Sequence, residues 1–99
     1  MVKHIVMWKL KEEAHGNSKA ENAQLIKDKL EALKGQVPGL LHIEVGIDFL
    51  GGGNFDVVLY SELDRKETLD IYQNHPKHQA LLPFIREAVT DRKAVDYEL

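Results

Sequence analysis

The stretch from Leu40 to Tyr60, LLHIEVGIDFLGGGNFDVVLY, contains two runs of strand-favouring residues separated by three consecutive glycines. In the first run every second residue is apolar, so one face carries Leu41, Ile43, Val45, Ile47 and Phe49. The glycines supply a turn before the second run, Phe55 to Tyr60, and the stretch therefore predicts a β-hairpin. A phosphate-binding loop is disfavoured, because no lysine–serine pair follows the glycines and the next element is a strand.

The residues before the hairpin predict one strand and one helix. Val2 to Leu10 is rich in strand-favouring residues, and alternation puts His4, Val6 and Trp8 on one face. Ser18 and Glu21 have the spacing of a capping box, which marks the start of a helix. Apolar residues then recur at steps of three and four up to the stop at Gly35 and Pro38, namely Ala23, Ile26, Leu30, Leu33 and Val37.

The residues after the hairpin predict a broken helical segment and a last strand. Asp64 and Glu67 repeat the capping spacing and open a helix that runs to Tyr72. Asn74-His75-Pro76 interrupts it, and a second helical piece is predicted from Lys77 toward Thr90, with a kink or break at Pro83. His75 is expected to cap or pack rather than to react. Val95, Tyr97 and Leu99 alternate with polar or small residues and form the final strand, with Asp96 on the opposite face.

The order strand, helix, strand, strand, helix, strand predicts an α+β protein with the ferredoxin-like βαββαβ fold. In this fold a four-stranded antiparallel sheet carries both helices on one side. Large apolar residues also occupy the other faces of the first and third strands, where no helix is available to cover them. Pairing of two sheets in a symmetric homodimer would bury this excess.

The composition restricts the classes of partner. With 99 residues, 43% of them hydrophobic and 29% charged, the chain suits one domain over residues 1–99. Thirteen basic and sixteen acidic residues give a net charge of -3, and no basic run is interleaved with aromatics, so nucleic acid is a disfavoured partner. No signal peptide pattern opens the chain, and no apolar run approaches the ~20 residues of a membrane span. The absence of cysteine fits a reducing compartment, and we expect a cytoplasmic protein.

Three blocks of sequence stand out: Lys3-His4-Ile5-Val6, the run Tyr72-Gln73-Asn74-His75-Pro76-Lys77-His78 with Phe84 downstream, and Asp96-Tyr97 near the end. Together they resemble the stress-responsive alpha/beta-barrel (Dabb) domain proteins. The resemblance covers nearly the whole chain. It implies a homodimer whose two sheets pack into an alpha/beta barrel, with a cavity in each subunit between the sheet and the helices.

The resemblance also implies a candidate site. In a plant polyketide cyclase of this family, the tyrosine and the last histidine of the matching run take part in an aldol ring closure. These residues would be Tyr72 and His78 here, with Asp96 placed to orient His78. The substrate-binding residues that we expect are His4, Val6, Trp8, Asp56, Val58 and Phe84. The third strand differs from that of the cyclase: Asp56 stands where the cyclase has a further pocket histidine.

The residue types suit proton transfer without a metal or an organic cofactor. An imidazole with an ordinary pKa of about 6.5 can accept a proton at neutral pH, and a carboxylate fixes its tautomer. The phenol of Tyr72 can donate to a substrate carbonyl and stabilise an enolate. The alternative is structural: His78 and Asp96 tie a helix to the last strand, and Tyr72 is hydrogen-bonded at the edge of the core. For His4 we favour a satisfied core histidine over direct catalysis.

A metal site is disfavoured. His75 and His78 are three residues apart, a spacing found among metal ligands, and Asp70 or Asp96 would be the third ligand. Pro76 lies between the two histidines and breaks the helix that would align them. No cysteine and no dense group of carboxylates accompanies them.

Three functional classes follow from these patterns. The leading one is a stress-related small-molecule binding protein of unassigned activity, able to bind or cyclise an aromatic or polyketide-like compound by histidine-mediated proton abstraction. The second is a structural or interaction dimer without catalysis. The third is a cofactor-free monooxygenase, suggested by Trp8 and His78.

Overall fold

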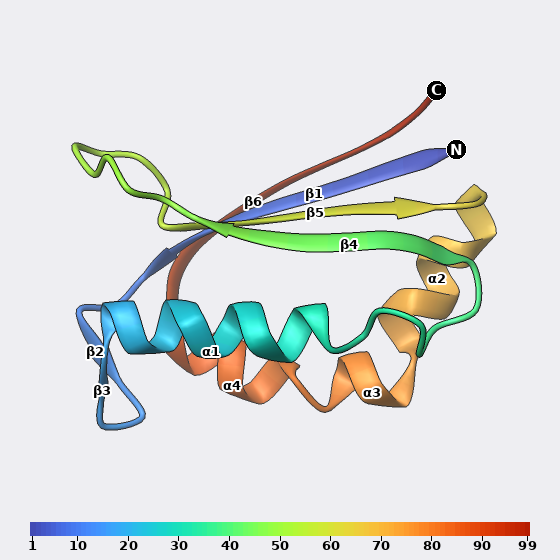
Figure 1. Ribbon diagram of the computed structural model, residues 1–99. Helices are drawn as coiled ribbons and strands as arrows, with labels where there is room; N and C mark the ends of the chain where they lie inside the picture. The colour runs from blue at the N-terminus through green and yellow to red at the C-terminus, as the bar shows by residue number, and fades with distance from the viewer.

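A four-stranded antiparallel sheet forms one layer of the computed structural model, which describes residues 1–99, and the helices form a second layer on one side of it (Figure 1). The strand order is β4-β5-β1-β6. The sheet strands are β1 (Val2–Leu10), β4 (Leu40–Ile47), β5 (Val57–Leu63) and β6 (Val89–Glu98). The helices are α1 (Lys19–Glu31), α2 (Lys66–Asn74), α3 (Pro76–Gln79) and α4 (Leu82–Ala88). The predicted ferredoxin-like fold is therefore confirmed.

The first helix begins where its capping box predicted. The Ser18 side chain accepts a hydrogen bond from the Glu21 backbone N–H at 3.2 Å, and the Glu21 carboxylate accepts one from the Ser18 backbone N–H at 3.0 Å. The helix ends at Glu31, earlier than predicted, and turns lead through Gly35, whose positive φ of 77° suits glycine. Leu33 and Val37 nevertheless stay buried, because these turns fold back onto the sheet.

Several other boundaries differ from the prediction. The predicted loop before α1 contains a small hairpin, β2 (Glu13–Ala14) and β3 (Asn17–Ser18). Asp64 does not cap α2; its carboxylate instead accepts a hydrogen bond from the Thr68 hydroxyl, and Arg65 is the N-cap residue. The helical piece predicted from Lys77 toward Thr90 is divided into α3 and α4, because Pro83 fits only within the first turn of a new helix.

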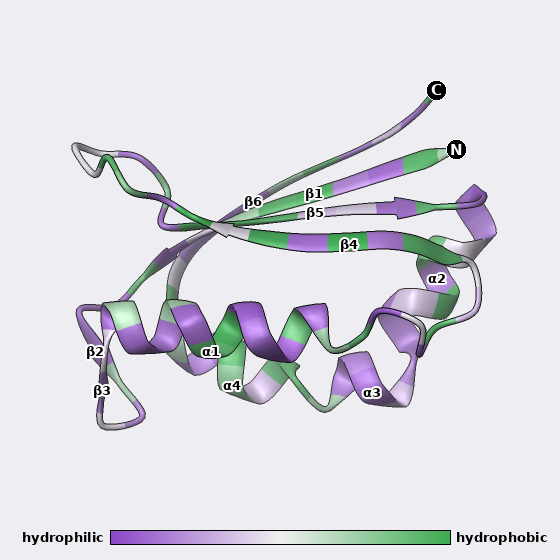
Figure 2. Ribbon diagram, viewed as in Figure 1, coloured by the Kyte–Doolittle hydropathy of each residue, from purple (hydrophilic) through white to green (hydrophobic).

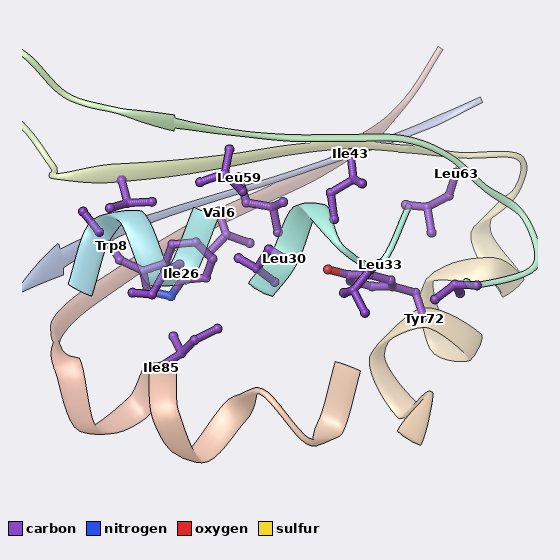
Figure 3. Packing of buried hydrophobic residues seen from close by; sticks show 14 of the residues in the cluster. Val6, Trp8, Ile26, Leu30, Leu33, Ile43, Leu59, Leu63, Tyr72 and Ile85 are labelled. Atoms are coloured by element: carbon purple, nitrogen blue, oxygen red, sulfur yellow. The ribbon is translucent and has the colours of Figure 1, made fainter. Parts of the chain in front are cut away.

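The core lies between the sheet and the helices (Figure 3). Alternation along the strands fills it, as the banding of β4 in Figure 2 illustrates. Val2, His4, Val6, Trp8 and Leu10 of β1 are all buried on the helix side, as predicted. From β4, Ile43 and Val45 are buried, whereas Leu41, Ile47 and Phe49 of the predicted apolar face are exposed. Leu41 falls at an irregularity in the pairing of β4 with β5, and Phe49 lies beyond the end of β4.

The side of the sheet that faces away from the helices is partly apolar, and we call it the open face. Register places Ile5 opposite Val95 and Met7 opposite Val58 on this side. Tyr97 belongs to the same face through its partner Lys3. Met7 and Val58 each keep 37% of their surface exposed, and Val95 keeps 52%. No element of the chain covers these residues.

Candidate functional site

A cavity of about 320 Å³ lies between the helix side of the sheet and the helices. The elements that contribute to it are β1, α1, β5 and the segment from α2 to β6. Its lining residues are His4, Val6, Trp8, Leu30, Leu59, Gln73, Asn74, His78, Gln79, Leu82, Ile85, Arg86 and Arg92. The cavity thus combines an apolar wall with two imidazoles, which is the composition expected of a small-molecule site.

His4 is held by a carboxylate on the neighbouring strand. It is buried on β1, and register places Asp96 of β6 directly opposite it, so both side chains point to the helix side of the sheet. The Asp96 carboxylate contacts Nδ1 of the His4 ring. When Nδ1–H donates to this carboxylate, Nε2 of the neutral ring is left as an acceptor. The pair therefore fixes both the orientation and the tautomer of His4.

The predicted pairing of Asp96 with His78 is wrong. Nδ1 of His78 lies 3.1 Å from the carbonyl oxygen of Gln73, to which it donates, so a backbone group at the end of α2 orients this ring. The sequence placed Asp96 on the face opposite Val95 and Tyr97, which the structure confirms. It could not supply the register between the first and last strands, and that register selects His4 as the partner.

Tyr72 lies beside both imidazoles. Its ring centroid is 4.5 Å from that of His78 and 5.9 Å from that of His4. The side chain is fully buried, and its hydroxyl has no hydrogen-bond partner, the one buried side-chain polar atom in the chain of which this is true. Figure 3 shows the hydroxyl pointing from α2 toward Leu30, which lines the cavity. Burial raises the pKa of Tyr72 well above its ordinary value, so the phenol stays protonated and can donate.

His78 is poised as a neutral base. Burial lowers the pKa of its imidazole below the ordinary value of 6.5, and the nearby rings of His4 and His75 act in the same direction. The hydrogen bond to Gln73 opposes this shift without overcoming it. At neutral pH the ring is therefore uncharged, and Nε2 can accept a proton while Nδ1–H is held by the backbone.

The lowered pKa of His78 predicts a pH dependence of stability. Because the folded protein binds this proton less tightly than the unfolded chain, the contribution of His78 to the free energy of unfolding is fully present above pH 6.5. This contribution is lost as the pH falls toward the folded pKa. His78→Gln should weaken this loss. Urea unfolding of both proteins at about pH 7.5 and about pH 5.5 measures it. An equal fall in both proteins would contradict the assignment.

The unpaired hydroxyl of Tyr72 predicts that Tyr72→Phe stabilises the ligand-free protein. An unsatisfied buried polar group costs free energy, so its removal should raise the free energy of unfolding by about 1 kcal/mol. Tyr60→Phe is the matched control, because the Tyr60 hydroxyl donates to Glu62 at 2.7 Å and accepts from Lys3 at 2.8 Å. That variant should lose stability. Chemical denaturation at equal protein concentrations compares the two, and destabilisation by Tyr72→Phe would show that the hydroxyl is paired.

The predicted substrate-binding residues divide among different places. His4, Val6 and Trp8 line the cavity with His78. Asp56 and Val58 do not; they line a separate hollow of about 620 Å³ beside the loop between β4 and β5. One oxygen of the Asp56 carboxylate accepts a hydrogen bond from the Leu10 backbone N–H at 2.8 Å, so this residue ties two strands together.

Phe84 also lies outside the cavity, contrary to the prediction. Its ring stacks on the ring of His15, with centroids 4.2 Å apart and an interplanar angle of 4°. The ammonium of Lys29 lies 4.9 Å from the same ring. Within α4 the next residue, Ile85, is buried and lines the cavity in its place.

Several lining residues were not recognised in the sequence, and the two charged ones among them are Arg86 and Arg92. The last strand was expected to begin near Ala94, whereas β6 begins at Val89 and pairs Arg92 with Trp8. A longer last strand would have included Arg92 in the sheet, but the pairing of Arg92 with Trp8 depends on register, which the sequence does not supply.

The histidines do not form a metal centre with neighbouring acids. No group of three or more His, Cys, Asp or Glu side chains is arranged to hold a metal ion. His75 is the N-cap of α3, and its Nδ1 accepts a hydrogen bond from the Lys77 backbone N–H at 3.1 Å, which confirms the capping role predicted for it. None of the helices has the length and apolar character needed to cross a membrane.

Comparison with known proteins supports the same architecture. The profile of the stress responsive A/B barrel domain matches residues 2–99. A dimeric protein of unknown function with a ferredoxin-like fold from Bacteroides fragilis is 34% identical, with 99% of this chain and 95% of that chain covered and a TM-score of 0.88. A dimeric ferredoxin-like protein of unknown function from Thermobifida fusca is 27% identical, with coverage of 99% and 90% and a TM-score of 0.84.

A more distant likeness concerns the fold alone. An antibiotic biosynthesis monooxygenase is 23% identical, with 100% of this chain and 98% of that chain covered and a TM-score of 0.77. No curated protein matches the sequence.

Proposed function

Because the chain belongs to the stress responsive A/B barrel domain family, we propose that it is a homodimer in which each subunit binds a small apolar or aromatic compound and abstracts a proton from it. One observation carries this proposal: a buried phenol without a hydrogen-bond partner lies against two imidazoles that line an apolar cavity. A buried donor without a partner is costly, and a substrate carbonyl would satisfy it.

In the proposed reaction the base takes a proton from a carbon next to a carbonyl group. Neutral His78 accepts the proton at Nε2, and the electron pair of the broken C–H bond moves onto the carbonyl oxygen to give an enolate. Tyr72 donates its phenolic hydrogen bond to that oxygen. In a substrate with a second carbonyl, attack of the enolate carbon forms the C–C bond of an aldol ring closure, and the imidazolium returns its proton to the new alkoxide. This reaction needs no oxidant and no reductant.

His4 and Asp96 have a supporting role in this scheme. The carboxylate fixes the His4 tautomer, so that Nε2 of His4 is an acceptor on a ring that lines the cavity. A second acceptor close to Tyr72 can hold a substrate hydroxyl or relay its proton. A purely structural role for the three predicted catalytic residues would leave the Tyr72 hydroxyl buried for no benefit.

The proposed dimer forms through the open face. Its apolar residues Ile5, Met7, Val58, Val95 and Tyr97 lie on one side of three adjacent strands, and nothing in the chain covers them. Two copies related by a twofold axis would bury this face in a barrel-like arrangement. The similar structures from Bacteroides fragilis and Thermobifida fusca are described as dimeric, which supports the proposal. A cytoplasmic location stays a prediction.

Deuterium exchange tests the proposed chemistry without knowledge of the natural substrate. Two aromatic ketones, 4-phenyl-2-butanone and 3-benzoylpropionate, exchange hydrogens next to their carbonyl groups with D₂O, and ¹H NMR follows the loss of signal. We expect the protein to accelerate exchange in at least one ketone above the rate in buffer, and Tyr72→Phe to reduce the acceleration. Exchange at the buffer rate in both ketones would contradict proton abstraction in this cavity.

Cofactor-free oxygenation is a second candidate, favoured by the position of Trp8 and His78 in one cavity. The fold is shared with an antibiotic biosynthesis monooxygenase. Oxygen uptake separates the two candidates, because the proton-transfer reaction consumes none. Uptake of one O₂ per substrate converted would favour the monooxygenase, if one oxygen atom is added to the product and the other leaves as water with two hydrogens from the substrate.

A further inference from the structure

The lining of the cavity that contains His4 and His78 carries two arginines and no acidic residue, although the chain as a whole is acidic. The net charge is -3, and the chain has three arginines, Arg65, Arg86 and Arg92. Two of these, Arg86 and Arg92, line the cavity, and none of its lining residues is an aspartate or a glutamate. Two guanidinium groups at an apolar cavity, with no acidic residue in its lining, indicate an anionic ligand.

Neither guanidinium is neutralised by the protein. Neither Arg86 nor Arg92 has a carboxylate within ion-pair distance, whereas Arg65 at the other end of the fold lies 3.9 Å from Glu67. The acids next to them in sequence pair elsewhere, Glu87 with Lys11 at 3.7 Å and Asp91 with Lys93 at 3.8 Å.

The two arginines approach the cavity from different elements. Arg92 lies on β6 opposite Trp8, and Arg86 follows the buried Ile85 on α4. Both are exposed, so they stand on the solvent side of the cavity, while Val6, Leu30 and Leu59 on its other side are fully buried. A ligand with an apolar body and a charged end would match this polarity.

We propose that the cavity selects a small aromatic compound that carries one carboxylate, and that Arg86 and Arg92 bind this carboxylate together. The inference rests on the proposed function and names the class of its substrate. The guanidinium fork matches a carboxylate in a bidentate arrangement. A phosphate is less well matched, because no lysine and no glycine-rich loop contributes to the lining. The volume of 320 Å³ suits a single ring with a short acidic side chain.

The fluorescence of Trp8 tests this selection. Trp8 is the single tryptophan of the chain and lines the cavity, so its emission reports on binding there. The probes are 3-phenylpropionate, its neutral analogue 3-phenylpropionamide, and 2-phenylethyl phosphate. We expect the carboxylate to bind ~10-fold or more tightly than the amide, with a preference that falls as salt rises.

Substitution of the arginines identifies the source of the preference. Arg86→Gln and Arg92→Gln should each weaken binding of the carboxylate and leave binding of the amide unchanged. Arg65→Gln is the matched control and should alter neither. Because both cavity arginines are exposed, these variants should unfold at the wild-type temperature. The salt dependence of carboxylate binding by the wild-type protein supplies a test that needs no variant.

The outcomes are distinct. Equal affinity for the acid and the amide would overturn the charge selection while leaving a ligand cavity in place. Tighter binding of the phosphate would overturn the assignment of a carboxylate. If no probe changes the emission of Trp8 at millimolar concentration, both this inference and the proposed function are contradicted.

Discussion

Replacing Val58 by lysine is expected to convert the proposed dimer into monomers. Val58 lies near the middle of the open face, opposite Met7 on β1, and its side chain packs over Gly46, where an added Cβ would lie 3.2 Å from it. In a twofold interface the substitution places two ammonium groups in apolar surroundings without partners. Each costs several kcal/mol, so the dimer Kd should rise roughly 1,000-fold or more.

Light scattering at micromolar concentration measures this effect. Ile71→Lys is the control, because Ile71 has a similar exposed fraction, 43%, but lies on α2 on the other side of the sheet. It should remain dimeric. A Val58→Lys protein that remains dimeric at the same concentration would show that the subunits meet through another surface.

His78→Gln is expected to abolish most of the proton exchange. Removal of a positioned general base typically costs ~10²- to 10⁴-fold in rate. His42→Gln is the matched control, since His42 lies on β4 with its Nε2 2.7 Å from Glu44, away from the cavity. The ¹H NMR exchange assay compares them. If the control loses exchange, or if His78→Gln exchanges at the wild-type rate, the assignment of His78 as the base is contradicted.

Asp96→Asn separates the two imidazoles. Because the Asp96 carboxylate contacts His4 and not His78, this substitution should leave the NMR titration of the His78 ring unchanged. The chemical shifts of the His4 ring should move, since its tautomer is no longer fixed. A displaced titration of His78 would restore the pairing that the sequence suggested.

Local patterns predicted the parts of the fold that depend on short-range chemistry. The Ser18 capping box, the buried face of β1 and the break at Pro83 follow from spacing and backbone geometry within a few residues. The pairing of His4 with Asp96, two residues 92 positions apart in sequence, depends instead on the register between β1 and β6. That register includes an irregularity at Lys9 and Leu10, which no local pattern indicates.

The candidate site was predicted in part for the same reason. His4 and Trp8 belong to a strand whose faces could be assigned, and His78 was indicated by the family resemblance. The structure brings all three to one cavity. Phe84 was misplaced because the rotation of a short helix after two interruptions determines which of its residues faces inward, and Ile85 does so. Arg86 was missed for this reason too.

Native mass spectrometry of the gently purified protein, before and after addition of 3-benzoylpropionate, tests the central claim most directly. The claim is that each subunit of a dimer holds one small aromatic compound in the cavity beside Tyr72, His4 and His78. We predict the mass of a dimer with up to two bound molecules, and a loss of the added compound in Arg92→Gln. A monomer, or a dimer that binds none of the compound at any concentration used, would contradict the account.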